Sequence, residues 1–326
     1  MTSGWRTIEL DRGDAGVRVD RVLLRHLRDE RGLSRNQIQK WIDRGDVLIN
    51  GAPPSRAAWR VRASDDLRVR IDRERVRARP AAEAVPLDVI YEDEHLLAIN
   101  KPAGLVVHPS YKNATGTLMN GVLQRARDWP VGDKPGLLGR LDKFTSGLVI
   151  VAKRAAIHAS LQRAMDARRI DKDYLAIVWG KPSPVRGTID LALDRDPWDR
   201  RRITVTDRGG QPSVTRYERL AVRGVEPSGS TFSLVRCRLI TGRTHQIRVH
   251  LSAKGWPLVG DAAYGRRGVR PSDDAAIEAA RVFPRQALHA WRLSFRHPVA
   301  GTELTLTAPL PGDLRALCAA LGLPTL

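Results

Sequence analysis

The chain has 326 residues, of which 42% are hydrophobic and 28% charged, a composition that fits about two folded domains and excludes a disordered chain. No stretch approaches the ~20 apolar residues of a membrane helix, and residues 1–6 lack the apolar segment of a signal peptide, so we expect a cytoplasmic protein that does not enter membranes. Two cysteines are too few for a disulfide framework or a cysteine-based zinc site, and the eight histidines show no metal-binding spacing, so we expect no metal.

The charge is strongly positive, with 55 Lys and Arg against 36 Asp and Glu and a formal net charge of +19. Residues 1–80 hold 19 basic and 12 acidic residues, so their charge density is nearly twice that of the rest of the chain. An excess of arginine favours forked contacts to phosphate. We therefore expect a nucleic-acid partner, with an anionic membrane surface as the weaker alternative.

The first predicted elements are two short helices followed by a hairpin. Apolar residues at helical spacing predict a helix over 18–31, and Ser34, with Gln37 three residues later, predicts a capped second helix that ends at Gly45. A strand at 47–49 runs into an Asn-Gly turn, and a second strand at 67–71 closes the hairpin.

This order resembles the S4 RNA-binding domain over residues 16–72. The likeness rests on Ser34-Arg35 at the start of the second helix and on the Gly-x-Val-x-Ile-Asn-Gly string at 45–51. A small α/β domain with a solvated charged face is the alternative. The resemblance implies that three basic residues of the second helix face RNA: Arg35, Lys40 and Arg44.

Residues 73–86 carry charge, Ala and Pro without an apolar period, which predicts an interdomain linker. A second domain over 87–312 then begins with two strands and a Lys-Pro-Ala-Gly loop. Further helices are expected over 113–127 and 155–170, and a last helix in 313–326. We also expect two irregular segments, a mobile basic loop at 194–202 and an insertion at 265–280.

A loop that enters a buried strand carries one carboxylate, Asp142, and one guanidinium, Arg140. An arginine beside an acid keeps the acid ionised, which suits a nucleophile or a base better than a general acid. An ordinary ion pair that closes the turn is the alternative reading of these two residues.

A second candidate segment, 240–265, contains Gly-Arg-Thr-His-Gln-Ile-Arg-Val-His. We expect Thr244 to cap a helix that ends at Gly255, which places Arg243 beside the helix N-terminus. The positive charge of the arginine side chain and the positive end of the helix would together form a binding site for a carboxylate or a phosphate. For Arg248, structural roles are at least as plausible as functional ones.

These strings resemble, in order, those of the RluA-type RNA pseudouridine synthases. The likeness extends over residues 16–312, and its most specific parts are Gly-Arg-Leu-Asp-x-x-Thr-Ser-Gly-Leu at 139–148 and the 240–265 segment. It implies that Asp142 is the catalytic nucleophile or base, that Arg243 pairs with it, and that Tyr174 stacks on the target base. Arg140 would fill the space that the uridine vacates or hold a phosphate. Further RNA contacts would come from Lys101, His108 and Arg248.

One position departs from the family pattern. RluA-type enzymes usually have a histidine before Arg-Leu-Asp, and this chain has Gly139, which is more typical of the sister RsuA type. The reaction that the resemblance implies is a redox-neutral isomerisation, so no cofactor is expected. Gly139 therefore bears on the choice of substrate.

The sequence thus predicts an α+β protein. A small S4 domain of two helices and a hairpin would precede a catalytic domain built on a mixed, largely antiparallel β-sheet with flanking helices. The expected substrate is large-subunit ribosomal RNA and the expected state a monomer. Transfer RNA is the alternative substrate, and a non-catalytic RNA-binding or ribosome-assembly factor is the alternative function.

Overall fold

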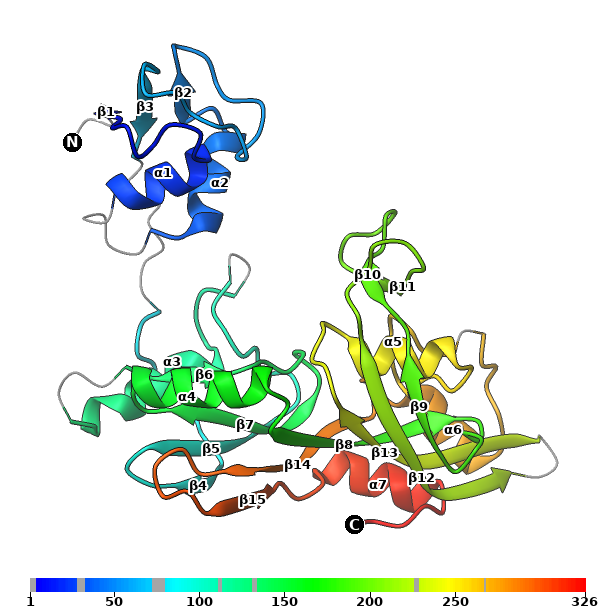
Figure 1. Ribbon diagram of the computed structural model, residues 1–326. Coiled ribbons are helices and arrows are strands. Elements are labelled where there is room, and N and C mark those ends of the chain that lie inside the picture. The colour runs from blue at the N-terminus through cyan, green and yellow to red at the C-terminus, as the bar shows by residue number, and fades with distance from the viewer. Residues whose placement is uncertain are drawn as a thin grey trace. The chain divides into compact units, whose positions relative to one another are not determined.

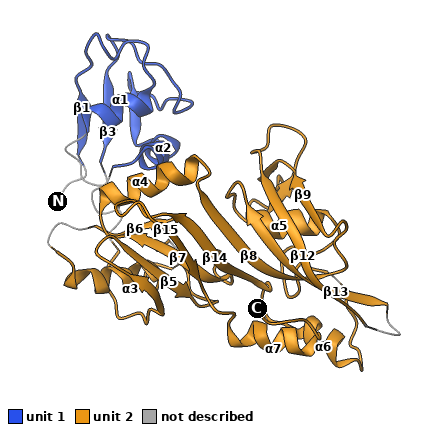
Figure 2. Ribbon diagram, turned by 60° about the horizontal axis from the view of Figure 1, so that its bottom comes forward, with its two compact units in different colours: residues 1–79 blue, residues 80–326 orange. Residues whose placement is uncertain are grey.

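The computed structural model describes residues 4–27, 33–71, 80–110, 113–130, 134–225, 229–266 and 268–326. The chain forms two compact units, residues 1–79 and residues 80–326 (Figure 2). In the described residues no helix has both the length and the apolar character needed to cross a bilayer.

Unit 1 consists of two helices and a three-stranded antiparallel sheet in the order β1-β3-β2. The helices pack on the sheet around the fully buried Trp41. Its elements are β1 (Trp5–Ile8), α1 (Val19–His26), α2 (Arg35–Asp43), β2 (Val47–Ile49) and β3 (Leu67–Arg70). β1 was not predicted, and it pairs with β3 from Trp5↔Arg70 to Ile8↔Leu67.

The two predicted helices of unit 1 are present. The first ends at His26, earlier than expected, and residues 28–31 of the predicted helix lie outside the described residues. The second begins with the predicted cap, because the Ser34 hydroxyl accepts a hydrogen bond from the backbone N–H of Gln37 at 3.3 Å. Arg35, Lys40 and Arg44 are exposed. Arg35 pairs with Asp20 at 2.9 Å, and Arg44 pairs with Asp46 at 3.1 Å.

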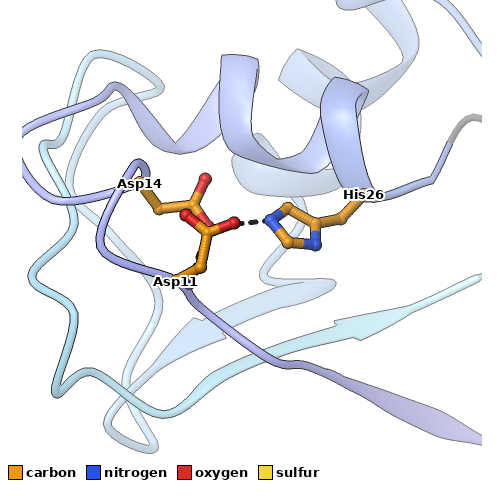
Figure 3. A group of neighbouring side chains, drawn as sticks. All are labelled: Asp11, Asp14 and His26. Carbon is orange, nitrogen blue, oxygen red and sulfur yellow. Dashed lines mark hydrogen bonds and ion pairs between the residues drawn. The ribbon is translucent and has the colours of Figure 1, made fainter.

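A compact group of charges joins the segment before α1 to the end of that helix, and Figure 3 shows three of its members, Asp11, Asp14 and His26. The group, called here the Asp14 cluster, consists of Asp11, Asp14, Arg25 and His26. The Arg25 guanidinium lies 2.7 Å from Asp11 Oδ2 and 2.6 Å from Asp14 Oδ1, and His26 Nε2 lies 2.8 Å from Asp14 Oδ2. Arg25 thus supplies the positive charge that two neighbouring carboxylates need.

Unit 2 is built on a ten-stranded sheet with the path β4-β5-β7-β14-β8-β13-β12-β9, to which β15 adds at β14 and β6 at β7 (Figure 1). In the part of the chain that the structure describes, its pairings are antiparallel except β7 with β14, so the predicted mixed, largely antiparallel sheet is present. The strands are β4 (Val89–Glu92), β5 (Leu96–Lys101), β6 (Gly136–Leu138), β7 (Ser146–Ala152), β8 (Ile170–Trp179), β9 (Arg186–Asp190), β12 (Val214–Val225), β13 (Ser230–Leu239), β14 (Leu288–Arg296) and β15 (Glu303–Thr307).

Helices cover both faces of this sheet. Alternation along β8 sends Leu175 and Ile177 toward α6 and α7, whereas Ala176 and Val178 meet α5 on the opposite face (Figure 1). The helices are α3 (Leu118–Arg125), a short 3-10 helix η2 (Ala126–Asp128), α4 (Ala155–Asp166), α5 (Gln246–Ala253), α6 (Ala275–Val282) and α7 (Gly312–Ala320).

Three predicted segments differ in the structure. The helix expected from residue 113 begins only at Leu118, because the Thr117 side chain caps it and forms a capping box with Asn120. The expected insertion at 265–280 contains the start of α6, which Asp274 caps. The expected mobile loop at 194–202 belongs to a hairpin formed by β10 (Leu193–Arg195) and β11 (Ile203–Val205).

The segment expected to link the domains is partly attached to unit 2. Residues 80–86 have no regular secondary structure and belong to that unit. Asn120 Nδ2 donates to the carbonyl of Ala81 at 2.7 Å, and the Glu83 carboxylate accepts from the backbone N–H of Gly116 at 2.7 Å. These bonds fix this end of the segment on the start of α3.

Candidate active site

A cleft of about 550 Å³ opens in unit 2 between the loop after β6, the start of β8 and the segment that enters α5. All four predicted catalytic residues line it, from three separate stretches of sequence: Arg140, Asp142, Tyr174 and Arg243. Arg248 also lines the cleft, whereas Lys101 and His108 do not. The volume is within the range of small-molecule sites, about 300–1,000 Å³.

Lys101 holds the loop that carries Asp142 in place. Lys101 is fully buried, and its ammonium donates to the carbonyls of Pro102, Leu105 and Lys143 at 2.7, 3.0 and 3.1 Å. The backbone N–H of Gly104 donates to the same Lys143 carbonyl at 2.9 Å. The prediction that Lys101 contacts RNA is therefore wrong, because its three donors already hold the loop and burial lowers its pKa to about 7.

The far side of the Asp142 loop is fixed by the parallel pairing of β7 with β14. Gly147 has φ of 110°, and a Cβ atom there would lie 2.2 Å from the carbonyl oxygen of Ala290, so only glycine fits. The hydroxyl of Ser146 lies 3.0 Å from His289 Nδ1. Arg285 donates to the carbonyl of Phe144 at 3.1 Å while its other arm pairs with Asp313. The loop is thus held rigidly.

Asp142 shares an arginine with a second carboxylate. Arg248 Nη1 donates to Asp142 Oδ2 at 3.0 Å, and the other side of the guanidinium forms two parallel bonds to Asp261, at 2.7 and 2.8 Å. Asp261 also accepts from the backbone N–H groups of Ala263 and Tyr264. Burial alone would raise the pKa of Asp261, but Arg248 and these N–H groups hold it below its ordinary value.

The arginine that pairs with Asp142 is therefore Arg248, and the predicted pairing with Arg243 is wrong. The cause is the start of α5. The helix begins at Gln246 with His245 as its N-cap in a left-handed conformation, φ 56°, and not with a Thr244 cap. Gln246 Oε1 accepts from the backbone N–H of Arg243 at 3.0 Å, and the Arg243 side chain is exposed at the cleft rim. Arg248 lies further along α5 and points into the protein.

His245 lies beside the same carboxylate, with Nε2 at 3.8 Å from Asp142 Oδ2. Its Nδ1 is 2.9 Å from the hydroxyl of Tyr264, and this hydroxyl accepts the backbone N–H of Ile203 at 2.8 Å. The Tyr264 proton is then available for Nδ1, which favours the tautomer with hydrogen on Nε2. Burial lowers the pKa of His245, although Asp142 opposes this effect. The group of Asp142, Arg248, Asp261 and His245 is called here the Asp142 cluster.

Tyr174 lies half-buried on β8 at the base of the cleft. Burial raises its pKa and the negative charge of Asp142 raises it further, so the phenol stays neutral at physiological pH. Two residues earlier, Lys172 also lines the cleft, and burial lowers its pKa. The cleft therefore offers an uncharged aromatic face next to a carboxylate.

The loop before Asp142 leaves room in the cleft. Gly139 has φ of 77°, a conformation that favours glycine, and a Cβ atom there would meet nothing within 4 Å. Arg140 is exposed, and among the described residues the ion pairs of Asp142 run to Arg248 and His245. His108 is exposed outside the cleft. The guanidinium of Arg140 is thus free to contact a ligand.

Sequence reasoning missed Asp261, Tyr264 and Lys172, and left His245 without a function. Asp261 and Tyr264 stand in the Gly-Asp-Ala-Ala-Tyr-Gly string that closes the 240–265 segment. The available signal was an aspartate and a tyrosine between two glycines, shortly after the helix that carries Arg248. The spacing alone did not indicate that the helix turns Arg248 toward them.

Comparisons with known proteins agree with this geometry. Residues 95–253 match the family model described as RNA pseudouridylate synthase. The chain is 39% identical over 317 residues to ribosomal large subunit pseudouridine synthase D of Nitrosomonas europaea, which covers 97% of this chain and 88% of that protein. The protein of the same name from Xanthomonas campestris is 40% identical over 309 residues, covering 94% of this chain and 89% of that protein.

The solved structure of human RNA pseudouridylate synthase domain containing 4 has the same fold. It matches with a TM-score of 0.58 and 26% identity, covering 73% of this chain and 94% of that chain. The range matched by the family model contains Asp142, Tyr174 and Arg248. The chain therefore belongs to the RNA pseudouridylate synthase family, in its RluA-type branch, and is an isomerase that acts on uridines in RNA.

Proposed function

We propose that this enzyme isomerises uridines of large-subunit ribosomal RNA and that Asp142 performs the chemistry. The observation that carries the proposal is which oxygen of the Asp142 carboxylate is bonded to neighbouring side chains. Its hydrogen bond from Arg248 goes to Oδ2, and among the described residues no hydrogen bond goes to Oδ1, so this oxygen can meet a substrate in the cleft. The relatives named ribosomal large subunit pseudouridine synthase D support ribosomal RNA as the substrate.

The reaction rearranges one nucleotide without gain or loss of atoms. The bond between N1 of uracil and C1′ of the ribose breaks, the uracil turns within the cleft, and a bond forms between C5 and C1′. The hydrogen that leaves C5 is balanced by one that N1 acquires. Asp142 attacks the sugar or the base, or removes the 2′ proton, and these routes share the same ionised carboxylate.

The residues around Asp142 have separate roles in this proposal. Arg248 orients Asp142 through a charge-assisted hydrogen bond. Tyr174 stacks on the uracil, an interaction worth about 1–3 kcal/mol per base. The target nucleotide must leave its helix to react, at a cost of a few kcal/mol. Arg140 and Arg243 at the rim bind phosphates or occupy the space that the uridine vacates.

Unit 1 acts, in this proposal, as an S4-type RNA-binding domain. Its two helices and hairpin support this reading, as do three exposed basic residues of α2, namely Arg35, Lys40 and Arg44. Replacing all three with Gln should reduce the magnitude of the salt dependence of RNA binding by about 2–3 units of the log–log slope. A matched triple replacement of exposed Arg12, Arg21 and Arg56 should change it less. Equal effects would contradict a specific role for α2.

The function is tested by mapping pseudouridines in ribosomal RNA with carbodiimide, alkali and primer extension in cells that lack this chain. Stops that vanish should return with the wild-type protein and with Asp171→Asn, a change at an exposed carboxylate of β8. They should not return with Asp142→Asn, although purified Asp142→Asn should bind RNA almost normally. A large loss of RNA binding in this variant would make Asp142 structural.

The same maps separate the alternatives. Unchanged ribosomal RNA with stops lost from transfer RNA would make transfer RNA the substrate. Unchanged maps for both would favour a non-catalytic RNA-binding or ribosome-assembly factor. The cleft lies within unit 2, so we propose that a monomer suffices, which sedimentation of the active protein tests.

A further inference from the structure

A hairpin of unit 2 displays an unusually exposed aromatic ring. β10 and β11 form a two-stranded sheet of their own, and residues 196–202 connect them (Figure 1). Trp198 in this connection is 95% exposed, whereas the next most exposed large hydrophobic side chains of the described residues, Val282 and Val299, are 56% exposed. An indole left in water offers a large apolar face to a partner.

The hairpin tip holds this residue in one backbone conformation. Asp196 Oδ1 accepts from the backbone N–H groups of Trp198 at 2.8 Å and Asp199 at 3.1 Å. Backbone bonds close the turn across its base, from Asp196 N–H to the Arg202 carbonyl at 3.0 Å and from Arg202 N–H to the Asp199 carbonyl at 2.8 Å. A partner that contacts the indole therefore has little loop entropy to overcome.

Residues 194–202 hold four arginines and three aspartates, so the hairpin tip around the indole carries a small net positive charge. Three exposed arginines belong to this tip: Arg195, Arg200 and Arg201. Asp199 holds the Arg201 guanidinium with two bonds, at 2.8 and 2.9 Å, and the Arg201 side chain is still 88% exposed. An aromatic face beside oriented guanidinium groups matches the chemistry of a nucleotide, which presents a flat base next to a phosphate.

The base of the hairpin is attached to the active site. Ile203 and Val205 pack against Val249 of α5, the helix that carries Arg248. Ile203 also donates its backbone N–H to the Tyr264 hydroxyl, which contacts His245. The RNA that enters the cleft therefore passes close to the root of this hairpin, and RNA is the partner that the charge and continuity favour.

We propose that Trp198 stacks on an unpaired base of the substrate RNA outside the cleft, while Arg200 and Arg201 bind the adjoining phosphates. The inference rests on the proposed function only in taking RNA as the ligand. Stacking accepts any base, so this contact would fix the position of the RNA strand and would require that the contacted nucleotide is not paired.

The test measures binding of the full-length protein to a dodecauridylate strand and to its duplex with dodecaadenylate. Trp198→Leu keeps an apolar side chain without a ring and should bind the single strand about 5- to 100-fold more weakly, with little change for the duplex. Trp198→Phe keeps a ring and should stay within about threefold of wild type. Val299→Ala, in the turn between β14 and β15, is the control for an exposed apolar residue and should bind normally.

Two results would overturn the proposal. One is wild-type binding of the single strand by Trp198→Leu, and the other is an equal loss on single strand and duplex. Unfolding temperatures check that the variants are folded. Binding to these oligonucleotides does not depend on which natural RNA is modified, so an unchanged ribosomal RNA map together with weakened binding would reject the substrate proposal and keep this one.

A spectroscopic measurement gives an independent readout. Trp198 is almost fully exposed, so subtracting the emission of Trp198→Phe from that of wild type isolates a signal that acrylamide quenches strongly. Dodecauridylate should quench this difference signal and protect it from acrylamide. A difference signal that the oligonucleotide leaves unchanged would contradict stacking at this residue.

Discussion

The Asp14 cluster of unit 1 and the Asp142 cluster of unit 2 are built from the same four side chains, two aspartates, an arginine shared between them and a histidine. In the first, both oxygens of the central carboxylate have ionic partners, with Asp14 Oδ1 at Arg25 and Oδ2 at His26. In the second, the Asp142 side chain is 20% exposed, against 1% for Asp14, and it lines the cleft with its one hydrogen bond among the described residues, from Arg248, on Oδ2. A charged cluster can take part in a reaction when a cleft exposes its central carboxylate.

The largest expected effect comes from removing the shared arginine of the Asp142 cluster. Arg248→Gln should lower kcat about a thousandfold, because Asp142 loses its charge-assisted bond and Asp261 is left buried without a cation. Arg243→Gln, at the rim of the same cleft, is the matched control and should cost less than about tenfold. Single-turnover kinetics on an RNA substrate measure both. A larger loss for Arg243→Gln would restore the pairing that the sequence predicted.

The second largest effect is a loss of folding stability at low pH, caused by His289, whose ring contacts Ser146 at the end of the Asp142 loop. Burial lowers the pKa of His289 to about 4 from an ordinary 6.5, so the unfolded chain binds a proton in this window that the folded chain does not. The free energy of unfolding should therefore fall as pH drops from 6.5 to 4, by about 3 kcal/mol from this residue.

Denaturant unfolding at several pH values checks this expectation. His289→Gln, which keeps a donor for the carbonyl of Ala308, should be less stable at neutral pH but show a flatter decline in this window. An identical slope in the two proteins would mean that other groups account for the acid sensitivity. Unit 2 should be followed by a probe of its own, since a chain with two compact units need not unfold in a single transition.

The third effect tests the outer carboxylate of the Asp142 cluster. Asp261→Asn keeps the shape of the side chain but removes the charge that holds Arg248 from behind, and we expect kcat to fall about 10- to 50-fold with KM little changed. A position that acts only through stability would leave kcat of the folded fraction unchanged. Such a result would limit Asp261 to a structural role.

The smallest effect is expected in unit 1. Asp14→Asn replaces an almost fully buried carboxylate, which pairs with Arg25 and His26, by a neutral amide. This change should lower the stability of unit 1 by about 1–2 kcal/mol. Turnover of a short RNA that occupies only the cleft should stay at the wild-type rate. A loss of turnover on that short RNA would show that the two clusters are coupled, and the comparison between them would fail.

The sequence predicted the large features of the fold because its signals there were local. The helix start at Ser34 and the strand entry after Asp142 follow from capping, apolar spacing and glycine punctuation. The start of α5 was misplaced by one residue, because the N-cap is His245 and not Thr244, and His245 takes a left-handed conformation that glycine or asparagine usually supplies. The expected pairing of Arg243 with Asp142 came from the family resemblance, and no local pattern indicated that Arg248 is the residue that reaches Asp142.

Other parts of the site depend on contacts between distant residues, which local patterns do not encode. From the sequence, Lys101 was expected to be a loop lysine that contacts RNA, yet three carbonyls from two loops surround it. β1 was not predicted because four residues with one buried position form a strand only by pairing with β3. The pairing of Asp261 with Arg248 likewise depends on a turn that brings it back to α5.

The parallel junction of β7 with β14 has a consequence for how the protein is made. The groups that hold the Asp142 loop in place, Arg285 and His289, are 141 and 143 residues downstream of their partners, and Arg285 itself is held by Asp313. A ribosome must therefore synthesise the chain through Asp313 before the loop can be fixed. A nascent chain that stops before Arg285 would carry both the 139–148 and the 240–265 motifs and still lack an ordered catalytic centre.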